Sequence, residues 1–283
     1  MTDTVLIFGY GFIGKAFADR ARASGHTIIA TARDAEKRAS LEAEGLASVD
    51  PGDAQALAQA VADASALLIT PAPGDDGCPA YASLEPHLKA TSGKWIGYLS
   101  TTGVYGDRDG GWVWEDSPLL PSSTEGRRRV LAESQWRGLG QHRVSTFRLP
   151  GLYGPGRNVI ERLRDGTARR IHKPDHVFSR LHHDDCATAL LAAMERRTRD
   201  SFNLCDDRPA PADQVLIHAA RLIGIAPPPA IAWDDPALSP ATRRFYADNK
   251  RVSNARAKAV LGWRLRYPTY VEGLNAIRAA LLP

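Results

Sequence analysis

Three glycines near the start of the chain have the spacing that lets a backbone turn bind phosphate groups. Gly9, Gly11 and Gly14 form a G-x-G-x-x-G pattern in FGYGFIG, after the apolar run TVLIFG and before a helical pattern. The first glycine permits a tight turn, the second lets the backbone approach a pyrophosphate, and the third lets the helix pack closely on the strand. Amides at the helix start, at Phe12 and Ile13, would then face the phosphates. The alternative is a turn used only for packing, but its place between strand and helix favours dinucleotide binding.

The end of the second expected strand indicates which dinucleotide would bind. An NAD-binding protein usually presents an acidic side chain to the ribose 2′-hydroxyl here, whereas this strand ends IIATARD, with Thr31 and then Arg33. A guanidinium can pair bidentately with a 2′-phosphate, and Arg38 is a candidate to assist, so we expect NADP rather than NAD. The alternative is that Arg33 faces solvent and Asp34 turns back to the ribose. Asp50, after the third strand, is a candidate contact to the adenine amino group or an N-cap of the next helix.

Apolar strands alternate with amphipathic helices through the first half of the chain. Strand-like runs at 4–9, 26–32, 66–70, 94–100 and 143–149 are separated by helical patterns, and SFNLC (201–205) returns as a later strand. This alternation is typical of a parallel sheet covered on both faces, so we expect an α/β, doubly wound Rossmann fold with a smaller C-terminal lobe. We assign residues 1–155, with a returning segment at about 180–205, to the NAD(P)-binding domain. Residues 156–179 and 206–283 are assigned to the lobe on the substrate side.

Composition narrows the class of protein and its environment. The 283 residues are 43% hydrophobic and 24% charged, which fits a globular domain, and no long apolar run predicts a membrane span. Three scattered cysteines predict neither a disulfide framework nor a metal site, and a reducing cytoplasm is the expected location. A net charge of +4 without a recognition motif does not support nucleic-acid binding. We interpret the excess of positive charge as basic side chains on the solvated surface, together with arginines that bind an anionic ligand.

Further motifs accompany the glycines: LSTTGVYGD (99–107), FRLPGLYGPGR (147–157), LHHDDCATAL (181–190) and NKRVSNARAKAVLGW (249–263). Together they resemble the extended and atypical short-chain dehydrogenase/reductases, the group that contains NAD-dependent epimerases and dehydratases. The resemblance implies that Thr101, or its neighbour Thr102, hydrogen-bonds the reacting oxygen. It also implies that Pro150, Gly151 and Leu152 form the loop against the nicotinamide carboxamide. Extended members often pair through helices flanking the active site, so a homodimer is one possibility, and the sequence leaves the oligomeric state open.

The family's catalytic tyrosine and lysine have no counterparts at the expected positions. Counting back from Glu133 places Arg129 at the lysine position and Glu125 at the tyrosine position. There is no tyrosine between Tyr105 and Tyr153 and no lysine between Lys94 and Lys173. A carboxyl with an ordinary pKa cannot donate a proton at neutral pH, and a permanent guanidinium cannot relay one. The alternative interpretation of Glu125 and Arg129 is a surface pair one helical turn apart.

Other groups are candidates for the missing proton donor. Tyr105 follows Thr101 closely, Tyr153 follows the nicotinamide loop, and His182 or His183 has a pKa near working pH. The family pattern implies instead that His182, Asp184 and Asp185 start a helix and join the two lobes. The spacing Tyr246 to Lys250 repeats the missing motif but lies far from the expected helix, and we interpret it as a coincidence.

The combined motifs predict an NADP-linked oxidoreductase that acts on a small polar carbonyl or sugar-like substrate. Hydride would pass to or from the nicotinamide while Thr101 orients the oxygen. The arginine-rich lobe would hold an anionic substrate, with Arg157, Arg169 and Arg180 as candidates. Two alternatives stay open: a non-catalytic NADP-binding sensor or scaffold, and a nucleotide-sugar epimerase or dehydratase.

Overall fold

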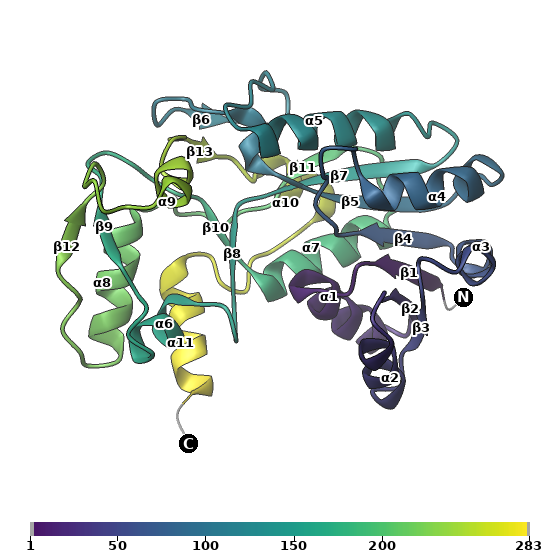
Figure 1. The fold of residues 1–283 in the computed structure, drawn as a ribbon, viewed down its shortest axis with the longest axis horizontal. Helices are drawn as coiled ribbons and strands as arrows, with labels where there is room; N and C mark the ends of the chain where they lie inside the picture. The colour runs from purple at the N-terminus through teal and green to yellow at the C-terminus, as the bar shows by residue number, and fades with distance from the viewer. Residues whose placement is uncertain (1–2, 282–283) are drawn as a thin grey trace.

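The centre of the protein is a sheet of seven parallel strands (Figure 1), in a computed structural model that describes residues 3–281. The strands follow the order β11-β7-β5-β4-β1-β2-β3 across the sheet. Their bounds are β1 (Thr4–Phe8), β2 (Thr27–Thr31), β3 (Ala47–Val49), β4 (Ala66–Ile69), β5 (Trp95–Thr101), β7 (Arg143–Leu149) and β11 (Ser201–Asn203). The predicted doubly wound parallel sheet is therefore confirmed, with the strand near residue 201 at its edge.

Helices cover both faces of the sheet because each central strand is apolar on both sides. In β1, Val5 and Ile7 belong to one buried cluster, and Leu6 and Phe8 belong to the other. The first cluster is closed by α1 (Phe12–Ala23), α2 (Ala35–Ala43) and α7 (His183–Glu195). The second is closed by α3 (Ala54–Asp63), α4 (Pro79–Lys89) and α5 (Thr124–Arg137). Figure 1 shows α1 and α7 below the sheet and α4 and α5 above it.

The strand order reverses at β1, which lies between β2 and β4. In open α/β sheets, ligands bind outside the carboxyl ends of the strands at such a switch point, because the two flanking loops diverge there. The glycine turn, the end of β2 and the end of β5 all lie at this edge of the sheet. The fold therefore brings together segments that are far apart in the sequence.

The rest of the chain forms short elements beyond the sheet's carboxyl edge (Figure 1). Three small parallel strand pairs join β8 (Gly151–Tyr153) to β10 (Arg180–His182), β9 (Arg170–His172) to β12 (Ala230–Ala232), and β6 (Trp112–Val113) to β13 (Arg251–Val252). The helical elements are η1 (Thr102–Tyr105), α6 (Val159–Arg164), α8 (Ala212–Leu222), α9 (Pro240–Phe245), α10 (Ala255–Leu261) and α11 (Tyr270–Ala280). Helices α6, α8 and α11 share a buried cluster of their own. Within residues 3–281, none of the helices combines the length and apolar character needed to cross a membrane.

One late segment packs on the sheet domain rather than on the lobe cluster. Ala257 and Leu261 of α10, with Trp263 after it, are buried in the same cluster as α1 and α7. The Trp263 Nε1 donates to the Asp185 backbone oxygen at 3.1 Å. The Asp185 carboxylate accepts from two backbone amides just beyond, at residues 266 and 267. Asp185 at the start of α7 therefore joins this segment to the sheet domain, in agreement with the role that the family pattern implies.

Candidate active site

The glycine turn is held between two threonines at the carboxyl edge of the sheet. Gly9 follows β1 with a φ of 91°, a conformation that favours glycine. Its N–H donates to the Thr31 Oγ1 at 2.9 Å, and its oxygen accepts from the Thr70 Oγ1 at 2.6 Å. A Cβ on Gly14 would lie only 2.8 Å from the Gly9 oxygen, so the third glycine is required for the close approach of α1. The sequence pattern gave no indication of either threonine, although both stand at the carboxyl ends of strands.

A hollow of about 450 Å³ opens beside this turn. It is lined by Tyr10, Gly11, Phe12, Lys15, Ala16, Asp19, Lys37, Pro155 and His183. A Cβ on Gly11 would meet nothing within 4 Å, so the backbone there is open to a ligand. The first turn of α1, with Phe12 and Ile13, carries no acidic residue that would oppose an anion. The positive end of the α1 dipole and the open Gly11 backbone together suit a pyrophosphate.

The loop after β2 leaves one arginine available. Arg33 is exposed, and within residues 3–281 its guanidinium forms no ion pair. Asp34 caps α2, accepting from the Lys37 N–H at 2.8 Å, so it does not turn back toward a ribose. Arg38 donates to the backbone oxygens of residues 32 and 33 and to the Asp50 carboxylate at 3.1 Å. Arg38 therefore braces the loop that presents Arg33.

Asp50 has a different role from the capping alternative considered for it. Its Oδ1 accepts from the Gly52 N–H at 2.8 Å, and its Oδ2 accepts from Arg38. The N-cap of α3 is Asp53, which accepts from the amides of residues 55 and 56. The capping interpretation of Asp50 was therefore wrong by three residues, because the turn at 51–52 separates Asp50 from the helix. The contact from Asp50 to adenine stays a prediction.

Thr101 and the loop predicted to contact the nicotinamide, at residues 150–152, lie at the ends of neighbouring strands. Thr101 ends β5 and pairs in register with Leu149 of β7, which directly precedes Pro150. The Thr101 side chain is partly exposed, and its Oγ1 accepts from the Gly103 N–H at 3.1 Å. Accepting this bond leaves the hydroxyl hydrogen available to a substrate oxygen. Pro150 and Leu152 are likewise partly exposed.

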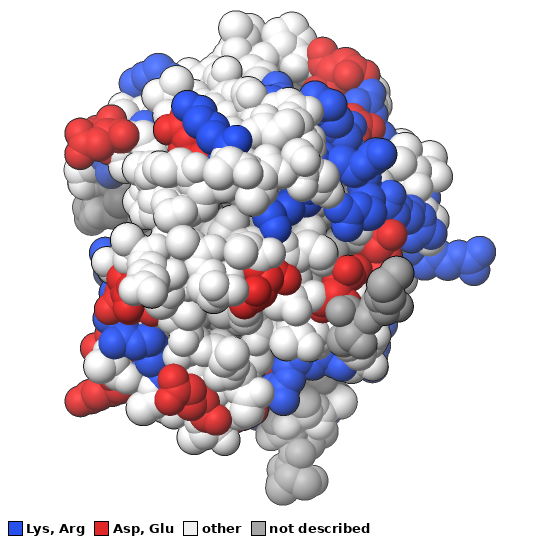
Figure 2. All heavy atoms as spheres, turned by 90° about the vertical axis from the view of Figure 1, so that its right-hand side faces the viewer, with Lys and Arg blue, Asp and Glu red and all other residues white. Residues whose placement is uncertain are grey.

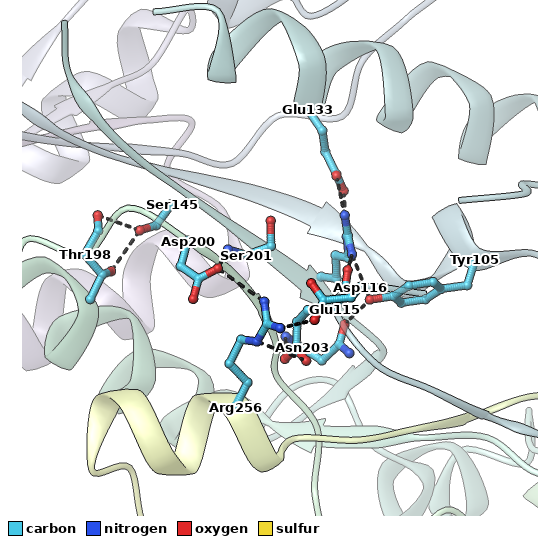
Figure 3. A network of polar contacts seen from close by, with 11 residues as sticks. Tyr105, Glu115, Asp116, Glu133, Ser145, Thr198, Asp200, Ser201, Asn203 and Arg256 are labelled. Carbon is cyan, nitrogen blue, oxygen red and sulfur yellow. Dashed lines mark hydrogen bonds and ion pairs between the residues drawn. The ribbon is translucent and has the colours of Figure 1, made fainter. Parts of the chain in front are cut away.

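Tyr105 is part of a buried polar network rather than of the open edge (Figure 3). Its hydroxyl donates to the Asn203 Oδ1 at 2.7 Å and accepts from the Arg148 Nη1 at 2.8 Å. Burial raises the pKa of Tyr105 above its ordinary value. Since the proton is already held by Asn203 and the ring is fully buried, we do not carry Tyr105 forward as a proton donor.

The same network holds α5 against the sheet. The Glu133 carboxylate accepts from the Arg148 Nε at 3.2 Å and Nη2 at 2.9 Å, and from the Ser100 Oγ at 2.6 Å. Arg148 is buried, and the opposite charge of Glu133 raises its pKa against the effect of burial. Ser100 directly precedes Thr101, so this ion pair fixes the end of β5 relative to α5. The sequence marked Glu133 as a register point but gave no sign of its partner.

Glu125 and Arg129 do not pair with each other. Glu125 is exposed in the first turn of α5, and within the described residues no ion pair joins it to Arg129. Arg129 instead turns under β5, where its Nη1 donates to the Tyr98 hydroxyl at 3.1 Å and to the Leu99 oxygen at 2.5 Å. The surface-pair alternative is therefore wrong, because the backbone oxygen and the buried phenol offer Arg129 better acceptors.

The two histidines and Tyr153 lie where the segment after Pro150 meets α7. His182 is buried and caps α7 by accepting from the Asp184 N–H at 3.2 Å, and burial lowers its pKa to about 4. His183 stacks on Phe12 at 5.1 Å and lines the hollow beside the glycine turn. The Tyr153 hydroxyl is buried and packs toward Gly273 of α11. His182 therefore starts the helix, as the family pattern implies.

Comparisons with known proteins agree with this arrangement. Residues 4–73 match the family described as NADP oxidoreductase, coenzyme F420-dependent. A solved structure of a functionally unknown conserved protein from Silicibacter pomeroyi DSS is 42% identical, covers 99% of each chain, and superposes with a TM-score of 0.93. The chain belongs to the same family as that protein.

More distant relatives carry named activities. The 3-diazoavenalumate denitrifying reductase of Streptomyces sp is 28% identical over 96% of this chain and 99% of that protein. The dTDP-glucose 4,6-dehydratase of Bacillus anthracis str. Ames, solved in complex with NAD, is 17% identical with a TM-score of 0.78 over 98% of this chain and 95% of that one. At this identity the likeness shows the fold alone. The fold is thus that of the pyridine-nucleotide oxidoreductases and epimerases.

Proposed function

We propose that this protein is an NADP-linked oxidoreductase of the atypical short-chain dehydrogenase/reductase group, acting on a small polar substrate. The observation that carries the proposal is the glycine turn, held by Thr31 and Thr70 beside a hollow at the switch point of the sheet. A bound nicotinamide supplies or accepts a hydride. The protein's part is to place the substrate atom next to that position.

The loop after β2 supports NADP over NAD. Asp34 accepts a hydrogen bond as the cap of α2, so its carboxylate is not turned toward a ribose 2′-hydroxyl. Arg33 is exposed and carries the charge and fork geometry that a 2′-phosphate requires. Arg38, fixed by Asp50, would hold the loop in place while Arg33 pairs with the phosphate.

Thr101 and Arg129 have separate roles in this proposal. Thr101 donates its free hydroxyl hydrogen to the reacting oxygen and so orients the substrate. Arg129 takes the position of the family's lysine and places a permanent cation beside the end of β5. It stabilises negative charge there and supports the nicotinamide ribose, but it transfers no proton. Pro150 and Leu152 close the other side of the nicotinamide position.

A second candidate function follows because, among residues 3–281, neither of the proton-donor candidates in the segments next to Thr101 is suited to that role. Glu125 is exposed and the Tyr105 proton is held by Asn203. A reduction in which the hydride displaces a leaving group on carbon forms a C–H bond, and the leaving group departs with the electrons of its own bond. No alkoxide forms, so no acid is required. The relative named 3-diazoavenalumate denitrifying reductase, alike over its whole length, favours this class of reductive displacement.

The two candidates are separated by one set of assays. The purified protein is incubated with NADPH, then NADH, and with two panels: aldehydes and ketones, and aromatic diazonium salts that release dinitrogen on reduction. Oxidation of NADPH with the first panel supports carbonyl reduction, and oxidation with the second supports displacement. Thr101→Val should slow the first reaction strongly and the second little. Tight NADPH binding without turnover on either panel would contradict both and favour a non-catalytic NADP-binding protein.

We also infer the domain division from these contacts. The NADP-binding domain comprises residues 1–155 and about 180–205, and the substrate lobe comprises residues 156–179 and 206–283. The shared cluster of α6, α8 and α11 supports the lobe as a unit. Residues 255–263 belong to the lobe in sequence but pack on α7. Limited proteolysis that cuts first between residues 223 and 248, leaving 255–263 protected, is the expected result.

A further inference from the structure

Arg180 lies directly across from the loop predicted to contact the nicotinamide. Strand β10 pairs in parallel with β8, and the register places Arg180 opposite Gly151 and His182 opposite Tyr153. Residues in register on neighbouring strands share a face of the sheet, as do residues two apart on one strand. The edge-on contact of the Tyr153 and His182 rings, at 5.2 Å, agrees with this. Arg180 and Tyr153 therefore project from the same face.

That face is open in front of Gly151. Gly151 is exposed, and a Cβ placed on it would have only the Ser179 oxygen within 4 Å, at 3.8 Å. A larger residue at this position would fill the space beside Arg180. The chain therefore leaves room for a ligand next to the nicotinamide loop.

One nitrogen of the Arg180 guanidinium is held by hydrogen bonds to the backbone. Its Nη1 donates to the backbone oxygens of Phe178 and Ala210, both at 2.9 Å. In the part of the chain from 3 to 281, no carboxylate lies within ion-pair distance of it, and its Nε and Nη2 donate to no protein acceptor. Arg180 is partly exposed; burial lowers its pKa, and the charge of nearby Asp206 opposes that shift. A partly buried guanidinium whose free edge has no direct carboxylate partner gains from a ligand that pairs with it.

Two buried polar groups, Tyr153 and Asp206, lie near Arg180. The Tyr153 hydroxyl is buried and has no partner. Asp206 is only 1% exposed, with its Oδ1 accepting from the Arg208 N–H at 3.2 Å and its Oδ2 unpartnered. Burial raises the pKa of Asp206 to about 7, and the charge of Arg180 opposes this shift. Asp206 is therefore a nearby acidic group, but it makes no direct ion pair with the guanidinium.

We propose that Arg180 binds the carboxylate of a small organic-acid substrate beside the nicotinamide position. The inference rests on the proposed oxidoreductase function and specifies its substrate class. The free Nε–Nη2 edge of Arg180 is the planar fork that matches the two oxygens of a carboxylate. Arg157 and Arg169, the other candidates for an anionic substrate, are exposed to solvent, which screens their charges. A single fixed cation suits a monoanion better than the diphosphate of a nucleotide sugar.

The test is a binding titration that requires no turnover. Benzoate is titrated calorimetrically into the full-length protein with and without NADPH, beside benzamide as its uncharged analogue and inorganic phosphate as a tetrahedral anion. Arg180→Met removes the fork, Arg180→Lys keeps a charge without the fork, and Arg169→Met is the matched surface control. Thermal unfolding and NADPH affinity are measured for every variant, so that a folding defect is recognised.

Benzoate should bind the unmodified protein about tenfold or more tightly than benzamide or phosphate. Arg180→Met should abolish this preference, Arg180→Lys should retain part of it, and Arg169→Met should leave it unchanged. If Arg180→Met does not fold, the decision rests on Arg180→Lys and on the comparison of benzoate with benzamide. Equal binding of benzoate and benzamide, tighter binding of phosphate, or an equal loss in Arg169→Met would overturn the proposal. Failure of NADPH to bind would count against the proposed function alone, since benzoate is also titrated without it.

Discussion

Replacing Glu133 by glutamine would break the buried ion pair that positions the end of β5. The Glu133 side chain is 1% exposed and that of Arg148 is 3% exposed, so solvent does not compensate for the loss of either charge. In Glu133→Gln the amide oxygen can accept from only one of the two Arg148 nitrogens that now donate to the carboxylate. The Arg148 guanidinium would remain buried beneath Tyr105 without a counter-ion.

Removing one partner of a buried pair costs about 3–5 kcal/mol. Because glutamine retains some of the hydrogen bonds, we expect the free energy of unfolding to fall by about 3 kcal/mol, measured by urea denaturation at pH 7. The matched control is Glu85→Gln, which breaks the solvent-screened pair of Glu85 and Lys89 and should lower stability far less. A loss below about 1 kcal/mol in Glu133→Gln would refute the reasoning.

Three further outcomes are expected. Arg33→Ala should weaken NADPH binding about 10- to 100-fold and leave NADH binding unchanged in fluorescence titrations, and an unchanged NADPH affinity would exclude Arg33 from the phosphate site. Gly154→Ala should reduce NADPH affinity, because the new methyl group would collide with the His183 ring that lines the hollow. An unaltered NADPH affinity would show that this ring does not position the cofactor. Burial lowers the pKa of His176 to about 4, so the folded protein holds this side chain neutral where the unfolded chain would protonate it. The stability that the neutral side chain contributes is therefore complete above pH 6.5 and is lost as the pH falls toward 4. Replacing it in His176→Phe should therefore make the stability less sensitive to acid over that range, by up to about 3 kcal/mol, and an unchanged acid profile in thermal unfolding would refute this.

The fold could be predicted from the sequence because its signals are local and repeated. Alternating apolar strands and amphipathic helices reveal the parallel sheet, and three glycines at fixed spacing mark the turn after β1. The family motifs predicted that Thr101 and residues 150–152 share one site, and the register of β5 with β7 brings these two segments together.

The sequence could not reveal contacts between residues that are distant along the chain. Nothing in the pattern distinguishes Arg148 from other arginines, yet it is the buried partner of both Glu133 and Tyr105. For the same reason Tyr105 looked like a candidate proton donor, although its hydroxyl is enclosed. Arg129 looked like half of a surface pair because its acceptors, Tyr98 and the Leu99 oxygen, come from another element.

The central claim is that the edge of the sheet at the glycine turn binds NADP for hydride transfer. The most direct test is a calorimetric titration of the purified protein with NADPH and, separately, NADH. The proposal expects one molecule of NADPH per chain, bound about tenfold or more tightly than NADH. Absence of binding by either nucleotide, or tighter binding of NADH, would contradict it.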